Sequence, residues 1–169
     1  WGERARDPFM ESGPRRAATS EAAHLLADLV DGGVRTLAFV RARASAEYVA
    51  DRAREILDER ESEAVNAVGS YRGGFLPEER REIEKRLFEG DLLGVVSTSA
   101  LEMGIDVGGL DACILVGYPG SILATRQRAG RVGRGRDGVI FVVPQEDALD
   151  RFFLNHPEQV VSRPCEDAT

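Results

Sequence analysis

Residues 125–136 concentrate positive charge in an otherwise acidic protein: they hold five arginines and three glycines, whereas the formal net charge of the whole chain is −7. Arginine keeps its charge and offers a planar fork of N–H donors that matches phosphate oxygens. Arg128, Arg131 and Arg134 recur every third residue and would share one side of a helical turn. The glycines between them leave room for a ligand or a facing domain to approach. The segment therefore predicts a site for an anion, with a solvated basic loop as the alternative.

A second group of polar residues follows an apolar run that ends at Ser97. Thr98 and Ser99 carry small hydroxyls which, at the start of a helix, can donate to a phosphate together with backbone N–H groups. Gly104 and Asp106 then form a tight turn in which the carboxylate could accept a hydrogen bond from a ribose hydroxyl. These residues predict a contact with a nucleotide or a nucleic acid. Helix capping by Ser99, together with a purely structural turn, is the alternative.

Lys85 is the only lysine among the 22 basic residues, and its position limits how the chain could bind a nucleoside triphosphate. A P-loop needs a lysine directly after a glycine-rich turn, whereas Lys85 lies in an amphipathic helical segment. The chain therefore cannot hold a nucleoside triphosphate in the P-loop manner. The two cysteines and two histidines are not spaced like metal ligands, so no metal site is expected.

Length and composition are those of one soluble domain, with 169 residues of which 43% are hydrophobic and 30% charged. No apolar run approaches the roughly 20 residues that span a bilayer, so we expect no membrane partner and a cytoplasmic location. The negative net charge argues against binding nucleic acid by bulk electrostatics, but it allows a local track of basic residues.

We expect residues 1–18 to form a linker, 19–156 the folded domain, and 157–169 a tail or the start of another domain.

Five short apolar runs alternate with helical patterns, and these elements must position the polar groups. The runs resemble strands buried on both faces, and they cover residues 34–40, 64–68, 92–97, 111–116 and 139–143. They predict an α/β fold, a RecA-like three-layer domain in which helices cover both faces of a mainly parallel sheet of five or six strands. Ligands of such sheets bind at the carboxyl ends of the strands. This rule selects the loops after Val40, Val68, Ser97, Val116 and Val143.

Three helices can be placed before or between the apolar runs. One begins near Thr19 and ends at Gly32, and another runs from Pro77 to Glu89 with Gly90 as its stop signal. Between them, a helix is expected to start at Ser45 as its N-cap. Its inner side is predicted to carry Tyr48, Val49, Arg52, Ala53, Ile56 and Leu57.

Four motifs, in this order along the chain, resemble those of the second RecA-like lobe of superfamily 2 helicases. Residues 36–41 resemble the motif IV strand, and residues 70–74 followed by Arg80 resemble the short glycine motif and helix that come next. Residues 98–106 are similar to motif V, and residues 127–134 to motif VI. The resemblance covers residues 19–156. Within this superfamily, residues 104–111 and 116–120 look most like the RecQ4-like DNA helicases, which include the bacterial mitomycin repair factor.

The resemblance implies a role for particular residues. Arg131 and Arg134 match the arginine fingers that reach a triphosphate on the first lobe, and are the implied catalytic residues. The implied ATP-binding residues are Gly104, Asp106 and Gln127. The implied nucleic-acid track consists of Arg41, Arg43, Gly73, Thr98 and Ser99. Arg126, Arg128 and Arg136 have no matched role and are expected to form a solvated basic rim.

The resemblance also implies what the chain works with. ATP and Mg²⁺ would be held mainly by a first RecA-like lobe of the same polypeptide, which this sequence does not contain, and the other partner would be single-stranded or partly duplex DNA. The implied activity is that of a 3′-to-5′ DNA helicase in DNA repair, with the isolated chain inactive. Two alternatives stay open: an RNA helicase lobe, although Gln127 stands where those proteins usually have histidine, and a RecA-like module that only binds.

Overall fold

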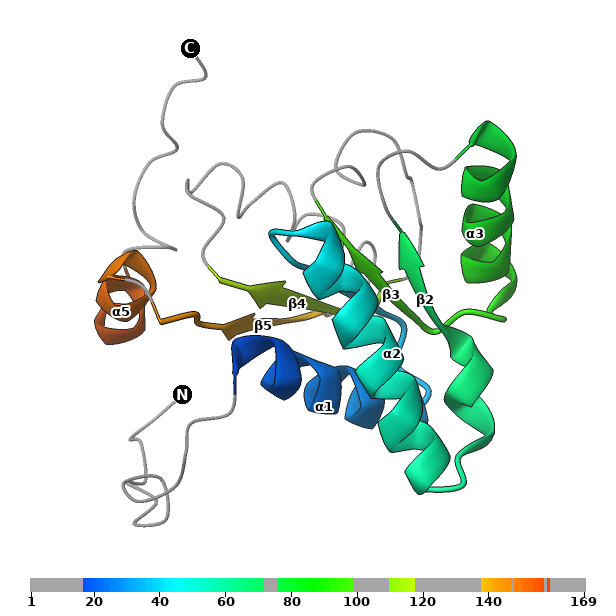
Figure 1. Cartoon of the computed structure of the whole chain (residues 1–169), viewed down its shortest axis with the longest axis horizontal. Coiled ribbons are helices and arrows are strands. Elements are labelled where there is room, and N and C mark those ends of the chain that lie inside the picture. Colours follow the sequence, from blue (N-terminus) through cyan, green and yellow to red (C-terminus); the bar gives the residue numbers. More distant parts are fainter. Residues whose placement is uncertain are drawn as a thin grey trace.

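The centre of the protein is a five-stranded sheet in which every pair of neighbouring strands is parallel (Figure 1). The computed structural model describes residues 17–71, 76–98, 110–117, 138–146, 148–156 and 158. The strand order is β2-β3-β1-β4-β5. The strands are β1 (Thr36–Phe39), β2 (Val68–Tyr71), β3 (Gly94–Ser97), β4 (Ala112–Val116) and β5 (Val139–Val143). The predicted α/β fold with a parallel sheet is confirmed.

Helices cover both faces of the sheet. Helices α1 (Ala18–Asp31) and α2 (Arg43–Glu59) lie in front of it in Figure 1 and bury their apolar sides against one face. Helix α3 (Pro77–Glu89) packs Leu87 and Ile83 against the other face. Helix α5 (Ala148–Asn155) follows β5, and a short 3₁₀ helix, η1 (Glu63–Ala67), precedes β2. No helix among the described residues is both long and apolar enough to cross a membrane.

Close packing between α1 and the sheet depends on a glycine at the start of β3. A Cβ atom on Gly94 would lie 2.7 Å from Cγ2 of Val30 and 3.0 Å from Cδ1 of Leu26. Both side chains are buried, so neither can swing into solvent. Gly94 therefore sets how near α1 can approach the sheet.

The apolar run at residues 64–68 is not the strand that the sequence predicts. Residues 63–67 form η1, whose first turn begins at Ser62, where the Oγ atom accepts a hydrogen bond from the Ala64 N–H at 3.2 Å. The strand starts at Val68 and ends at Tyr71. Short apolar runs fit a strand or a helical turn equally well, and here the local cap decides the outcome. The loop at the carboxyl end of the sheet therefore follows Tyr71 and not Val68.

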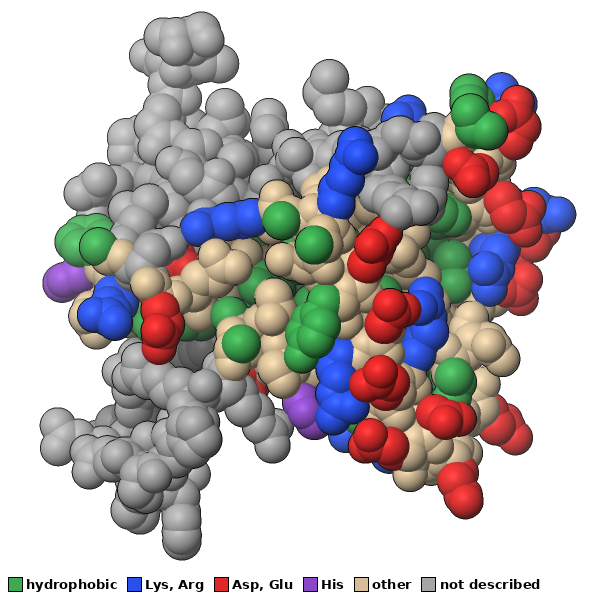
Figure 2. Space-filling view, viewed as in Figure 1, with side chains coloured by type: hydrophobic (Ala, Val, Ile, Leu, Met, Phe, Trp, Pro, Cys, Tyr) green, Lys and Arg blue, Asp and Glu red, His purple; other side chains and the backbone are tan. Residues whose placement is uncertain are grey.

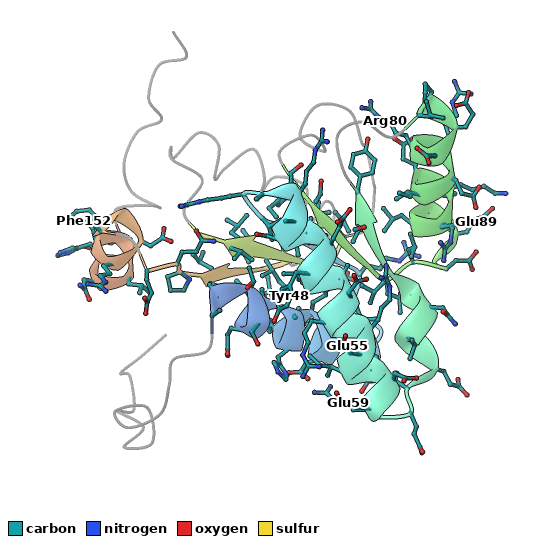
Figure 3. All side chains as sticks on the ribbon, in the orientation of Figure 1. Tyr48, Glu55, Glu59, Arg80, Glu89 and Phe152 are labelled. Carbon is teal, nitrogen blue, oxygen red and sulfur yellow. The ribbon has the colours of Figure 1, made fainter. Side chains whose placement is uncertain are left out.

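The prediction for α2 is wrong at its start and partly wrong on its inner side. The helix begins at Arg43 instead of Ser45, and Tyr48 is 48% exposed (Figure 3). The buried side consists of Ala46, Val49, Ala50, Ala53, Ile56 and Leu57. The alanines on this side let α2 pack closely against α1, which leaves Tyr48 on the outer edge.

Arg52 also faces outward on α2. Its guanidinium donates to Glu55 at 2.8 Å and to Glu59 at 3.4 Å. The hydrogen bond with Glu55 is the largest cause that raises the pKa of Arg52 above its ordinary value; desolvation opposes the rise, and Glu59 adds to it. Figure 2 shows acidic and basic side chains interspersed over α2 and α3, as expected of solvated helix faces.

The limits of α3 are those predicted from the sequence. The Leu76 N–H donates to the Glu79 carboxylate at 2.7 Å, which satisfies one donor at the helix start. At the other end, Gly90 adopts a φ of 87°, the left-handed conformation in which glycine ends helices. The predictions for Pro77 and Gly90 are confirmed.

Candidate nucleic-acid interface

Arg41 and Thr98 follow neighbouring strands at the carboxyl edge of the sheet. Phe39 is level with Ser97 across the pair of β1 and β3, and the Val40 N–H donates to the Ser97 carbonyl at 2.9 Å. The ladder thus continues to the last residue before Arg41. Because parallel strands lie about 5 Å apart, the backbones at Val40 and Thr98 run side by side. Two segments that the sequence assigned to one nucleic-acid track therefore meet at the same edge.

Thr98 is held close to the end of β3. The Ser97 hydroxyl is part of a buried residue and donates to the Thr98 carbonyl at 2.7 Å. Thr98 itself is only half-buried. Thr98 thus combines a backbone held at the end of β3 with a side chain on a partly accessible residue, which suits a contact to a phosphate or a sugar.

Arg43 is the first residue of α2 and is exposed. The N-cap position is Ala42, whose methyl side chain makes no capping hydrogen bond. The first turn of α2 also contains no acidic residue. The positive end of the helix dipole and the charge of Arg43 both attract an anion, and no acidic residue in the first turn opposes them.

Arg41 contacts two residues to which the sequence analysis assigned no role, Asp150 and Gly117. Its Nη2 atom lies 3.8 Å from Oδ1 of Asp150, a residue of α5. A Cβ atom on Gly117, directly after β4, would lie 3.1 Å from Cζ, Nε and Nη2 of Arg41, so the guanidinium lies against this glycine. The sequence analysis did not predict the contact between Arg41 and Asp150, because nothing in the sequence of α5 indicates that it lies beside an arginine more than 100 residues earlier.

Arg80 lies beside the end of β2. Its guanidinium carbon is 6.0 Å from the centre of the Tyr71 ring, at the outer range of a cation–π contact (Figure 3). Tyr71 is buried and ends β2. The glycine segment at residues 72–75 follows it immediately in the sequence. Arg80 thus lies close to where that segment leaves the sheet.

The remaining predicted site residues lie outside the described residues. For the nucleic-acid track these are Gly73 and Ser99. For ATP and catalysis they are Gly104, Asp106, Gln127, Arg131 and Arg134. Their roles stay predictions. Within the described part of the chain, no group of three or more His, Cys, Asp or Glu side chains could hold a metal ion.

Residues 21–136 match the sequence model of the family described as "Helicase conserved C-terminal domain". The match includes β1 to β4 and both segments that the sequence had singled out. The chain belongs to this helicase family. The predicted relationship to the second, C-terminal lobe of superfamily 2 DNA helicases is confirmed.

Individual relatives agree with the family match. An uncharacterized ATP-dependent helicase of Bacillus subtilis, YprA, is 41% identical over 91% of this chain. The ATP-dependent helicase hrq1 of Schizosaccharomyces pombe is 34% identical over 100% of it. A crystal structure of the DUF1998 helicase MrfA bound to DNA and AMPPNP superimposes with a TM-score of 0.84, at 40% identity over 92% of the chain.

This helicase lobe corresponds to a limited part of those proteins. It spans 20% of YprA, 16% of hrq1 and 22% of the MrfA chain. The agreement in fold confirms the RecA-like architecture expected from the sequence.

Proposed function

We propose that this chain is the second motor lobe of an ATP-dependent DNA helicase that moves 3′ to 5′ along one strand. The observation that carries the proposal is the family match over residues 21–136, which contains the arginine segment and the edge formed by Arg41 and Thr98. The structure of MrfA with DNA and AMPPNP supports DNA and ATP as the ligands of the whole enzyme. A role in DNA repair in the cytoplasm is part of the same proposal.

ATP and Mg²⁺ would be held mainly by a first lobe, because this lobe offers no P-loop lysine. Lys85 lies on α3, where its side chain is 64% exposed and its Nζ atom is 4.0 Å from Oε1 of Glu89. This lobe would contribute Gly104, Asp106 and Gln127 to the nucleotide site. Arg131 and Arg134 would reach the γ-phosphate when the lobes close, and offset the charge that develops there. Arginine fingers of this kind contribute about 10³–10⁵ in rate.

The DNA strand would run along the carboxyl edge of the sheet. Arg41 and Arg43 would supply positive charge there, and Thr98, Ser99 and Gly73 would supply hydroxyl and backbone donors. Contacts of this type fix the strand through its phosphates without reading sequence. Closing and opening of the two lobes during each ATP cycle would then move the lobe along the strand.

The proposal predicts which nucleic acid stimulates the enzyme. In the helicase that carries this lobe, we expect single-stranded DNA to stimulate ATP hydrolysis more strongly than RNA of the same length. Equal stimulation by RNA would assign the lobe to the RNA helicases instead. The isolated 169-residue chain should hydrolyse no more ATP than the double variant Arg131→Ala, Arg134→Ala. Hydrolysis above that control would show that the chain holds ATP without a first lobe.

A further inference from the structure

Three elements converge on the guanidinium of Arg41. Arg41 follows β1, Gly117 follows the neighbouring strand β4, and Asp150 lies in α5, which comes after β5. In Figure 1, α5 lies past the carboxyl ends of β4 and β5. Asp150 is therefore brought to the edge of the sheet from a helix that lies beyond the family match, which ends at residue 136.

The side chain of Asp150 is held in place by burial and by a backbone hydrogen bond, independently of Arg41. Its side chain is 1% exposed, and its Oδ2 atom accepts a hydrogen bond from the Gln145 N–H at 2.6 Å. The Oδ1 atom faces Arg41 at 3.8 Å. A buried carboxylate that is held by the backbone can orient a long side chain, which would otherwise sample many rotamers.

Gly117 supports the same side chain from the end of β4. Its φ of 81° suits glycine, and its N–H donates to the Val143 carbonyl at 2.8 Å, which ties the ends of β4 and β5 together. The lack of a Cβ atom lets the guanidinium approach the backbone. Even with both contacts, 44% of the Arg41 side chain remains exposed at the edge where Thr98 lies.

We propose that Asp150 and Gly117 are positioning residues that hold Arg41 in the orientation in which it binds a phosphate of the DNA strand. The inference rests on the proposed function, because Arg41 belongs to the proposed track. It extends that track to α5, which would act on the DNA through Arg41.

The direction in which Asp150→Asn changes the affinity for DNA tests the inference. Asp150→Asn keeps the size of the side chain and an oxygen that can accept from Gln145, but removes the negative charge. If Asp150 only adds negative charge near the DNA, or competes with it for Arg41, the variant should bind DNA more tightly. If Asp150 positions Arg41, the variant should bind more weakly, by roughly threefold to tenfold.

The measurement is binding of a fluorescent oligo(dT) strand to the full-length helicase, followed by anisotropy at several salt concentrations. Arg41→Ala should weaken binding and reduce the slope of log K against log salt by about 0.7, the value for one phosphate contact to a single strand. In the Arg41→Ala background, Asp150→Asn should cause no further loss. A loss of the same size in both backgrounds would show that Asp150 acts on stability, and would overturn the inference.

Gly117→Ala is the second variant, with Gly33→Ala as its control. Both glycines have positive φ, 81° and 76°, so an alanine strains the backbone at either position. At Gly33 nothing lies within 4 Å of the added Cβ, whereas at Gly117 the Cβ meets Arg41. We expect Gly117→Ala to weaken binding of oligo(dT) and Gly33→Ala to leave it unchanged. Equal effects of the two variants would contradict a positioning role for Gly117.

The outcomes separate this inference from the function on which it rests. If Arg41→Ala leaves DNA binding unchanged, the proposed track is wrong at Arg41, and the positioning role is wrong with it. If Arg41→Ala weakens binding while Asp150→Asn and Gly117→Ala do not, the track stands and only the positioning role is overturned. Weaker binding in all three variants, with the loss from Asp150→Asn confined to the chain that retains Arg41, supports both.

Discussion

At the scale of single residues, two glycines allow close contacts that any larger residue would prevent. Gly94 lets α1 approach β3, and Gly117 lets Arg41 lie against the end of β4. In both cases a Cβ atom would meet a neighbour at closer than ordinary van der Waals distance. Gly94 thus serves the packing of α1 on the sheet, and Gly117 serves the candidate site.

Gly94→Ala should destabilise the lobe by about 1–3 kcal/mol, because the added methyl overlaps the buried side chains of Val30 and Leu26. Denaturant unfolding would measure the change. Gly69→Ala is the matched control, since its Cβ would contact Leu92 at an ordinary 3.5 Å. In the double variant with Val30→Ala, the loss should be smaller than the sum of the two single losses, because the added methyl no longer overlaps Val30. Additive losses in the double variant would show that the overlap with Val30 is not the cause.

At the scale of elements, helices α1 and α2 form one layer whose inner side is set by small residues. Arg60, just after α2, donates to Asp28 of α1 at 2.8 Å, and Ser62 donates to Asp31 at 2.6 Å. These exposed contacts lie at one end of the helix pair, whereas the buried alanines and leucines lie along its length. Exposed pairs of this kind contribute little, so burial must supply most of the stability of the layer.

The burial pattern of α2 predicts that truncating two of its large side chains changes the free energy of unfolding by very different amounts. Leu57→Ala removes a fully buried side chain and should lower the free energy of unfolding by about 2–5 kcal/mol. Tyr48→Ala removes a side chain that is 48% exposed, and should change the free energy by at most about 0.5 kcal/mol. Chemical denaturation of both variants provides the comparison. A loss at Tyr48 as large as that at Leu57 would mean that Tyr48 is covered in the folded protein.

The sequence predicted β1, β3, β4 and β5 because each lies in a mostly apolar run, and such a run can be recognised without knowing which strands pair. It failed at residues 64–68, where a local cap at Ser62 favours a 3₁₀ turn. It also placed Tyr48 on the inner side of α2, because hydrophobicity alone does not show that alanines pack more closely. These errors arise where tertiary packing or a single hydrogen bond decides between similar patterns.

The candidate site was predictable to the extent that its residues come directly after strands. Arg41 and Thr98 could be assigned to one edge because parallel strands end together, and the structure brings their segments side by side. Asp150 could not be assigned, since its contact with Arg41 joins segments far apart in the sequence and depends on where α5 packs. Pattern and spacing predict the residues at the end of a strand, but not the side chains that a later helix brings to them.

At the scale of the whole molecule, the lobe has the fold and family of a helicase motor but only part of the proposed site. Its basic edge lies on a protein of net charge −7, so DNA would be held by local contacts and not by overall attraction. Its arginine segment would act on ATP bound by another lobe. The central claim is therefore that Arg131 and Arg134 serve catalysis across an interface between two lobes.

The most direct test is the rate of DNA-stimulated ATP hydrolysis by the full-length helicase with Arg131→Ala or Arg134→Ala, and with Arg136→Ala as the matched control in the same segment. We expect each of the first two variants to lose about 10³–10⁵ in kcat while still binding single-stranded DNA. Arg136→Ala should hydrolyse ATP at close to the normal rate. If Arg131→Ala and Arg134→Ala retained kcat within a few-fold of the unaltered enzyme, the proposed role of this lobe in catalysis would be wrong.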